Sequence, residues 1–247
     1  ILYDCLNREE DIWCERVYDP WVDMQEKMRE HDLPLWAHES KDSVREFDFL
    51  GFTLQYEMSY TNVLNMLELA NMPLYSKDRT EEHPIIIGGG PCVYNAEPMA
   101  DFCDLITIGE GEEVMPELVA RYRACRDNGE SKVEFLKKAA QIGGVYVPSL
   151  YDISYKEDGT IAAITPKEGA PAVVRKRVVK DLDKVYYPEN GVVTVYLTME
   201  SPFAPAQVLI GNVGTTEKRF HIDVYYAPGT EMNPFDLPMG QITTELE

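Results

Sequence analysis

The sequence is short of basic residues. Its 247 residues include 23 lysines and arginines against 43 aspartates and glutamates, which gives a formal net charge of −20. Because so acidic a surface repels polyanions, nucleic acid and anionic membranes are excluded as partners of the general surface. The basic run at 175–180 is an exception. It is either a solvated connector or a segment that docks on the acidic main domain.

The sequence also lacks a signal peptide and any apolar run near the roughly 20 residues that a membrane helix needs. We therefore expect a soluble, cytoplasmic protein. The five cysteines show no CxxC spacing of the kind that holds zinc or an iron–sulfur cluster. They are Cys5, Cys14, Cys92, Cys103 and Cys125. Reduced, mostly buried thiols are the expected state.

Several catalytic motifs are missing as well. The four histidines (His31, His38, His83 and His221) form no HxxxH or HExxH pair, which excludes a metalloprotease site. There is no GxSxG elbow, no Walker A loop and no GxGxxG fingerprint. These absences exclude an α/β-hydrolase nucleophile and disfavour a nicotinamide dinucleotide. Trp13, Trp21 and Trp36 are expected in the core.

Two glycine-rich turns stand out among the residues that are present. Each follows a short apolar strand, at Ile85–Ile87 and at Leu105–Ile108. The first turn consists of Gly88, Gly89, Gly90 and Pro91, and the second of Gly109, Glu110, Gly111 and Glu112. Glycines at the carboxyl ends of parallel strands let backbone amides approach a ligand closely.

The second turn opens directly into a helix, whose free amides form an anion or dipole site. Its acidic side chains fit the hydroxyl or amide groups of a ligand better than a phosphate. The alternative is that these glycines only make a tight strand–helix turn. Gln55, Tyr56 and Glu57 follow another strand and should line the same crevice, unless they only cap the next helix.

The pattern along the first 150 residues alternates between strands and helices. Strands are expected at 13–18, 34–37, 47–55, 85–87 and 105–108, and helices at 23–30, 61–69, 96–102, 112–126 and 131–141. This alternation predicts an α/β fold with a mostly parallel sheet and helices on both faces. Leu2 and Leu6 indicate that the chain begins within a helical pattern, and we expect further sequence upstream of Ile1.

Three regions are expected from the changes in composition. Residues 1–150 form the α/β domain. Residues 151–189 form a hairpin, with Asp158–Gly159 as its turn, and an extended connector. Residues 190–247 are rich in β-branched and aromatic residues and form either a small β unit or an extended tail.

Residues 1–189 resemble a known group of proteins. The stretch GGGPCVYNAEPMADFCDLITIGEGEE, together with RVYDPWVDMQEKMREHDLPLWAHES and FDFLGFTLQYEMSYTNVLNMLELANMPL, is similar to the N-terminal region of an uncharacterised family of radical SAM proteins. These proteins carry a cobalamin (B12)-binding-like domain ahead of a radical SAM barrel. The resemblance implies a Rossmann-like, flavodoxin-type sheet, with cobalamin or a ligand of that size over the carboxyl ends of the strands.

The same resemblance implies which residues would contact the ligand. The two loops would be Gly88–Pro91 and Gly109–Glu112, with Gln55, Tyr56 and Glu57 near the rim. The family's first strand is expected upstream of Ile1, and no DxHxxG motif supplies a lower histidine ligand for cobalt. A domain that has lost cobalamin and kept the fold is therefore also consistent with the sequence.

The chain has no CxxxCxxC motif, which in radical SAM barrels holds a [4Fe–4S] cluster and leaves one iron open for S-adenosylmethionine. Both groups are expected only in full-length relatives, and we do not expect this chain to be catalytic alone.

The first hypothesis is a cobalamin-binding accessory domain of a radical SAM protein, with the barrel as its partner. The alternative is a non-catalytic Rossmann-like module whose vestigial crevice serves protein–protein contact. A flavin-binding flavodoxin-like domain is disfavoured by the absence of a Ser/Thr-rich phosphate loop.

Overall fold

A computed structural model of the chain describes residues 1–181, 219–223 and 241–245. The chain divides into two compact units, Ile1–Tyr186 and Tyr187–Glu247. In the second unit, strands β7 (Arg219–Asp223) and β8 (Gln241–Glu245) pair antiparallel. The remainder of the expected 190–247 segment lies outside the described residues.

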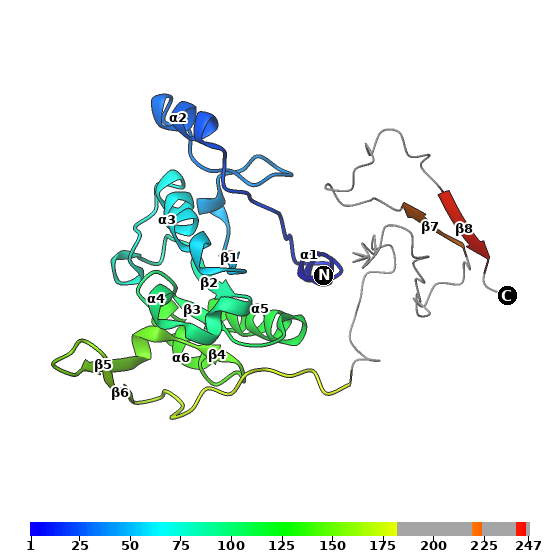
Figure 1. Cartoon of the computed structure of the whole chain (residues 1–247). Helices are drawn as coiled ribbons and strands as arrows, with labels where there is room; N and C mark the ends of the chain where they lie inside the picture. The colour runs from blue at the N-terminus through cyan, green and yellow to red at the C-terminus, as the bar shows by residue number, and fades with distance from the viewer. Residues whose placement is uncertain (182–218, 224–240, 246–247) are drawn as a thin grey trace. The chain divides into compact units, whose positions relative to one another are not determined.

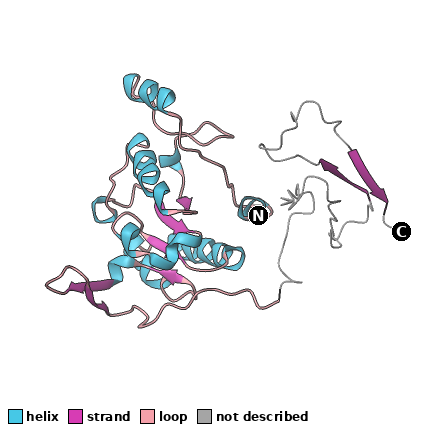
Figure 2. Cartoon of the chain, in the orientation of Figure 1, coloured by secondary structure: helices cyan, strands magenta, loops and turns pink. Residues whose placement is uncertain are grey.

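The first unit is built on a four-stranded sheet with the order β1-β2-β3-β4. Strands β1 (Phe49–Thr53), β2 (Ile85–Gly89) and β3 (Leu105–Thr107) run parallel, and β4 (Val145–Tyr146) pairs antiparallel with β3. Figures 1 and 2 show these strands side by side with helices packed around them. The expected α/β fold with a mostly parallel sheet is confirmed.

Six α-helices are present in the described part of the chain. They are α1 (Leu2–Asn7), α2 (Val22–Glu30), α3 (Tyr60–Leu69), α4 (Glu97–Ala100), α5 (Gly111–Asp127) and α6 (Lys132–Ala139). Helix α6 begins with a capping box, in which Ser131 and Glu134 bond each other's backbone amides. Short 3₁₀ helices include η2 (Glu57–Ser59) after β1 and η4 (Pro91–Asn95) after β2.

Side chains on both faces of the sheet are covered. On one face, the Phe49 ring lies 4.8 Å from Tyr122 of α5 and 6.2 Å from Phe135 of α6, between ring centroids. Leu50 and Phe52 point to the opposite face, because side chains alternate along a strand, and both are buried. The central β2 residues Ile85–Ile87 are buried throughout, as expected for a parallel strand with helices on both sides.

Two expected strands are absent. Residues 13–18 have no strand partner, because side chains bind their backbone amides: Asn7 accepts from Cys14, and the Glu39 carboxylate accepts from Arg16. Residues 34–37 form only one bridge, between Trp36 and Ser43.

The expectation of a tryptophan core is wrong for two of the three residues. Trp13 and Trp21 are 74% and 79% exposed, while Trp36 packs partly buried against the core. In the 13–21 segment it is Val17, and neither tryptophan, that packs against the core.

A hairpin follows the sheet, as expected. Strand β5 (Tyr151–Tyr155) pairs antiparallel with β6 (Ile161–Pro166), and Gly159 in the turn has a φ of +81°. Within the described ranges, no helix is long and apolar enough to cross a membrane.

Candidate functional site

The first glycine turn lies at the carboxyl end of β2, where the expected crevice should be. Gly88 and Gly89 are strand residues, paired with Phe52 and Thr53 of β1, so the turn itself begins only at Gly90. A Cβ atom built on Gly88 would lie 3.2 Å from the Cys103 sulfur. One on Gly89 would lie 2.9 Å from the Thr107 hydroxyl. Close packing against Cys103 and against Thr107 of β3 therefore already requires small residues at these two positions.

Gly90 and Pro91 turn the chain into η4. Gly90 has a φ of +96°, and a Cβ atom there would lie 2.9 Å from the carbonyl oxygen of Leu54. Leu54 donates its amide to Gly89 at 2.7 Å and accepts from Cys92 at 3.1 Å. The loops that follow β1 and β2 are thus bonded to each other, and Leu54 fills the space in front of Gly90.

The rim residues expected after β1 are exposed. Gln55, Tyr56 and Glu57 all face solvent, and Tyr56 is 59% exposed. Met58 of η2 and Tyr94 of η4, which lie on the segments that follow β1 and β2, are 82% and 65% exposed. The residues that follow β1 and β2 are therefore the solvent-exposed part of the carboxyl edge of the sheet.

The second glycine turn connects β3 to α5. Gly109 has a φ of +107°, Glu110 precedes the first residue of α5, and Gly111 and Glu112 lie within the first helical turn. A Cβ atom on Gly111 would lie 3.1 Å from the side chain of Leu2 in α1. The start of α5 is therefore covered by α1 of the same chain.

The connector docks on this second turn. Arg177 donates its backbone amide to the Ile108 carbonyl at 2.8 Å and accepts from the Glu110 amide at 3.2 Å. Gly109 and Arg177 form a parallel β-bridge. A Cβ atom on Gly109 would overlap the Arg177 backbone, with its nitrogen only 2.7 Å away. Glycine is needed at this position both for its φ and for the approach of the connector.

The Arg177 side chain holds the connector against α5. Its guanidinium pairs with Glu113 at 2.7 Å and with Glu117, and these bonds raise the Arg177 pKa. Two residues later, Val179 is buried and donates its amide to the Glu110 carboxylate. The basic run therefore docks on the acidic domain, which is one of the two alternatives that the sequence left open.

Gly144 forms the other wall of this docking site. It has a φ of +93°, and a Cβ atom there would lie 3.0 Å from both the Arg177 Cβ and the Ile108 carbonyl oxygen. Its own carbonyl accepts from the Ile108 amide at 2.7 Å. We name the groove formed by Gly109, Glu110, Glu113, Glu117 and Gly144 the connector groove. In Figure 1 the connector is the yellow trace that continues from the β5–β6 hairpin.

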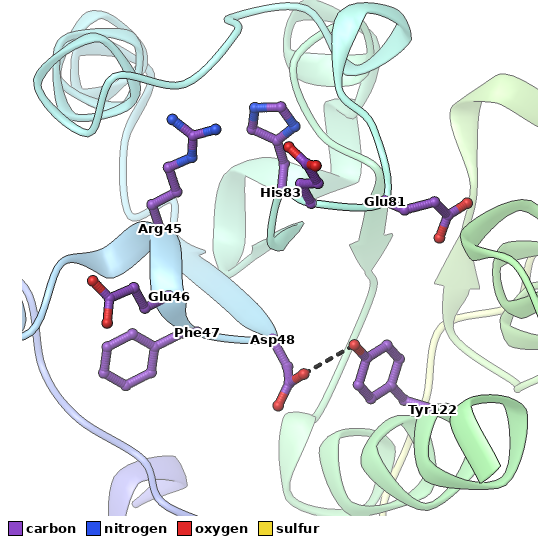
Figure 3. Close-up of a pocket in the computed structure, with 8 residues that line it drawn as sticks. Arg45, Glu46, Phe47, Asp48, Glu81, His83 and Tyr122 are labelled. Atoms are coloured by element: carbon purple, nitrogen blue, oxygen red, sulfur yellow. Dashed lines mark hydrogen bonds between the residues drawn. The ribbon is translucent and has the colours of Figure 1, made fainter. Parts of the chain in front are cut away.

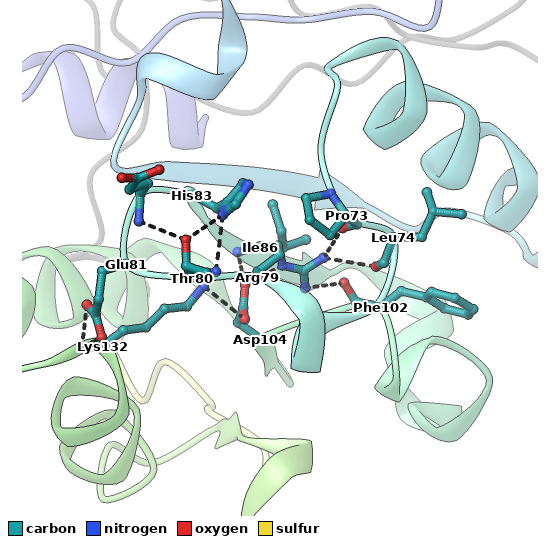
Figure 4. A network of polar contacts seen from close by, with 11 residues as sticks. Pro73, Leu74, Arg79, Thr80, Glu81, His83, Ile86, Phe102, Asp104 and Lys132 are labelled. Carbon is teal, nitrogen blue, oxygen red and sulfur yellow. Dashed lines mark hydrogen bonds and ion pairs between the residues drawn. The ribbon is translucent and has the colours of Figure 1, made fainter.

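A buried charged cluster lies at the opposite, amino-terminal edge of the sheet (Figure 4). The Asp104 carboxylate accepts from the Ile86 amide at 2.7 Å and pairs with Lys132 at 3.1 Å and Arg79 at 3.3 Å. Arg79 also donates to the carbonyls of Pro73, Leu74 and Phe102. Desolvation lowers the pKa of both cations, and Asp104 opposes that shift. This cluster joins the loops before β2 and β3 to the start of α6.

A cavity of about 480 Å³ opens beside that cluster (Figure 3). It is lined by Arg45, Glu46, Phe47, Asp48, Glu81, Glu82, His83 and Tyr122. Tyr122 donates to Asp48 at 2.9 Å, and burial with this bond raises the Tyr122 pKa to about 12. Ligands of open α/β sheets bind at the carboxyl ends of the strands, so the cavity is at the unusual end. Among the described residues, no group of three or more His, Cys, Asp or Glu side chains could hold a metal ion.

Sequence reasoning missed the part that Arg177 plays. Its signal was a short basic run in an otherwise acidic chain, but the sequence could not tell which turn the run contacts. The sequence did indicate both glycine turns, and the structure places them at the ends of the neighbouring strands β2 and β3. The two turns differ in their surroundings. The turn after β2 remains partly open, and the turn after β3 is covered by the connector of the same chain.

The comparisons with known proteins identify the family. A relative that is an uncharacterised protein of Methanocaldococcus jannaschii is 33% identical over 100 residues, which cover 38% of this chain. The match spans only 20% of that relative's length. No solved structure matches the chain. Residues 1–148 match the sequence model of the N-terminal region of radical SAM proteins. The chain therefore belongs to the family defined by the N-terminal region of radical SAM proteins.

Proposed function

We propose that residues 1–181 form a non-catalytic accessory module that anchors its own connector. The observation that carries this proposal is the Arg177 backbone, which is hydrogen-bonded on both sides of Gly109. Backbone bonds and the pairs with Glu113 and Glu117 hold Arg177, and Val179, two residues later, is buried. They fix the place where the chain leaves the α/β domain.

The family match supports a position for this module in longer proteins. It covers the N-terminal region of radical SAM proteins, which supports the radical SAM domain of longer relatives as the partner of the module. The [4Fe–4S] cluster and S-adenosylmethionine belong to that domain, since its chemistry needs the three-cysteine motif that this chain lacks. An anchored connector would restrict the orientations that the two domains can take.

Cobalamin is the ligand that the resemblance implies for the carboxyl edge, and the described residues fit it poorly. Protein atoms of Cys103, Thr107 and Leu54 fill the space over Gly88–Gly90, and Arg177 fills that over Gly109. His83 lies at the opposite edge, beside the cavity. We therefore favour a crevice that is vestigial as a cofactor site, and we derive no chemistry through a corrinoid.

The open β1–β2 edge gives the cobalamin hypothesis its remaining support. There, Tyr56, Met58 and Tyr94 could cover a large flat ligand, with Gln55 and Glu57 beside them. The test is incubation of the chain with hydroxocobalamin or methylcobalamin, followed by desalting and a visible spectrum. We expect no retained corrinoid. Retention that is lost in Tyr56→Ala and kept in Tyr155→Ala, an equally exposed tyrosine of the hairpin, would replace our proposal with a cofactor-binding function.

Anchoring itself is tested by trypsin, which cleaves after lysine and arginine. We expect cleavage at Arg175–Lys180 to be slower than cleavage after Lys156 in the exposed hairpin turn. The double variant Glu113→Gln, Glu117→Gln should speed cleavage of the connector severalfold, because both partners of the Arg177 guanidinium lose their charge. Glu112→Gln on the same helix is the matched control and should leave the rate unchanged. Equal rates for the connector and the hairpin turn in the unaltered chain would contradict anchoring.

A further inference from the structure

We infer that the connector groove is a peptide-recognition site that selects an extended segment of the form Arg-x-Val. This inference rests on the proposed anchoring and adds what the groove recognises. The chain presents this pattern once in the connector, as Arg177-Val178-Val179. The groove would therefore bind the same short segment when it is supplied as a separate peptide.

The backbone contacts are those of strand addition. The Arg177 amide and carbonyl bond to Ile108 and Glu110, on either side of Gly109, in parallel orientation. In this mode of recognition, main-chain bonds supply affinity for any extended segment, and alternate side chains supply the selection. Gly109 and Gly144 let the peptide backbone approach, because any side chain at either position would meet Arg177.

The two selected side chains are Arg177 and Val179. Arg177 is 25% exposed and meets two carboxylates on successive turns of α5. Val179 is 8% exposed, whereas Val178 between them is 49% exposed and points away. Alternation of buried, exposed and buried positions is the pattern expected of an extended segment lying along a groove. Recognition of the arginine therefore depends on Glu113 and Glu117, and recognition of the valine depends on an apolar contact.

The groove must be emptied before a peptide can enter it. In the unaltered chain the connector competes at an effective concentration on the order of millimolar, because it is tethered to its own site. The double variant Arg177→Ala, Val179→Asp should release the connector and leave every residue of the groove unchanged. A fluorescent peptide with the sequence of residues 173–181, VVRKRVVKD, is the probe, and binding is followed by fluorescence anisotropy on the full chain.

Charge alone is the main competing explanation, because the chain carries a net charge of −20. Two altered peptides separate charge from recognition. Arg177→Ala and Arg175→Ala remove the same charge, but only the first removes the side chain that Glu113 and Glu117 bind. We expect the first change to weaken binding about tenfold, as for a doubly bonded arginine, and the second to change it less than about twofold.

The inference predicts saturable binding to the released variant, at least tenfold weaker binding to the unaltered chain, and the stated difference between the peptides. It is overturned if the released variant does not bind the peptide, if both chains bind it equally, or if both altered peptides lose affinity equally. Failure of anchoring is a separate result, because it shows in the unaltered chain as rapid trypsin cleavage of the connector. Protection of the connector without peptide selection would overturn the recognition alone.

Discussion

Replacing Asp104 with alanine is expected to lower the free energy of unfolding by about 3–5 kcal/mol, which is the cost of breaking a buried ion pair on one side. The Asp104 side chain is 3% exposed and that of Arg79 is fully buried. Removal of the carboxylate leaves the charges of Arg79 and Lys132 inside the protein without their common partner. It also leaves the buried Ile86 amide, near the start of β2, without an acceptor.

Urea unfolding followed by tryptophan fluorescence measures this loss. All three tryptophans lie in the first unit, and the partly buried Trp36 packs against its core. The matched control is Asp152→Ala, which removes an aspartate that is 74% exposed and paired with Lys167 at 3.2 Å. The control should change stability little, because exposed pairs contribute little. Equal effects of the two substitutions would contradict a structural role for the buried cluster.

Replacing Gly109 with valine is expected to release the connector and raise its trypsin cleavage rate by roughly tenfold or more. The φ of +107° disfavours a β-branched residue, and the new side chain would occupy the position of the Arg177 backbone. Each loss of about 1.4 kcal/mol in the stability of the docked state raises the open population about tenfold. Cleavage follows that population when opening is fast.

The control for this variant separates backbone strain from displacement. Gly129 also has a positive φ, of +67°, but no atom lies within 4 Å of a Cβ built there. Gly129→Ala should cost some stability and leave connector cleavage near that of the unaltered chain. If Gly109→Val unfolds the whole domain, the tryptophan fluorescence will report it, and Gly109→Ala then provides the milder test. Release by Gly129→Ala alone would contradict displacement as the cause.

The sheet could be predicted from sequence because its strands carry strong local signals. Ile85–Ile87 and Leu105–Ile106 are buried apolar runs with a glycine one to three residues further on, and helix α6 begins with a capping box at Ser131 and Glu134. Strand β4 could not be predicted, because two residues are too few to set a pattern. The false strand at 13–18 had suitable residues, but its amides are bound by Asn7 and Glu39 instead of a neighbouring strand.

The positions of the two glycine turns could be predicted from the sequence, and the residues that contact them could not. Glycines marked both turns, since positive φ at Gly90 and Gly109 leaves a trace in the sequence. What fills the space beside each glycine depends on residues far along the chain, such as Arg177, which is 68 positions after Gly109 by their residue numbers. A glycine that admits a ligand and a glycine that admits another part of the chain have the same local sequence signal.

Hydrogen exchange of the backbone amides tests the anchored connector most directly. The Arg177 amide bonds to Ile108, the Val179 amide to Glu110, and the Glu110 amide to Arg177. We expect these three amides to exchange slowly and to lose protection together in Gly109→Val, while the β2 amides stay protected. Exchange of the Arg177 and Val179 amides at the rate of an unstructured peptide in the unaltered chain would contradict the account.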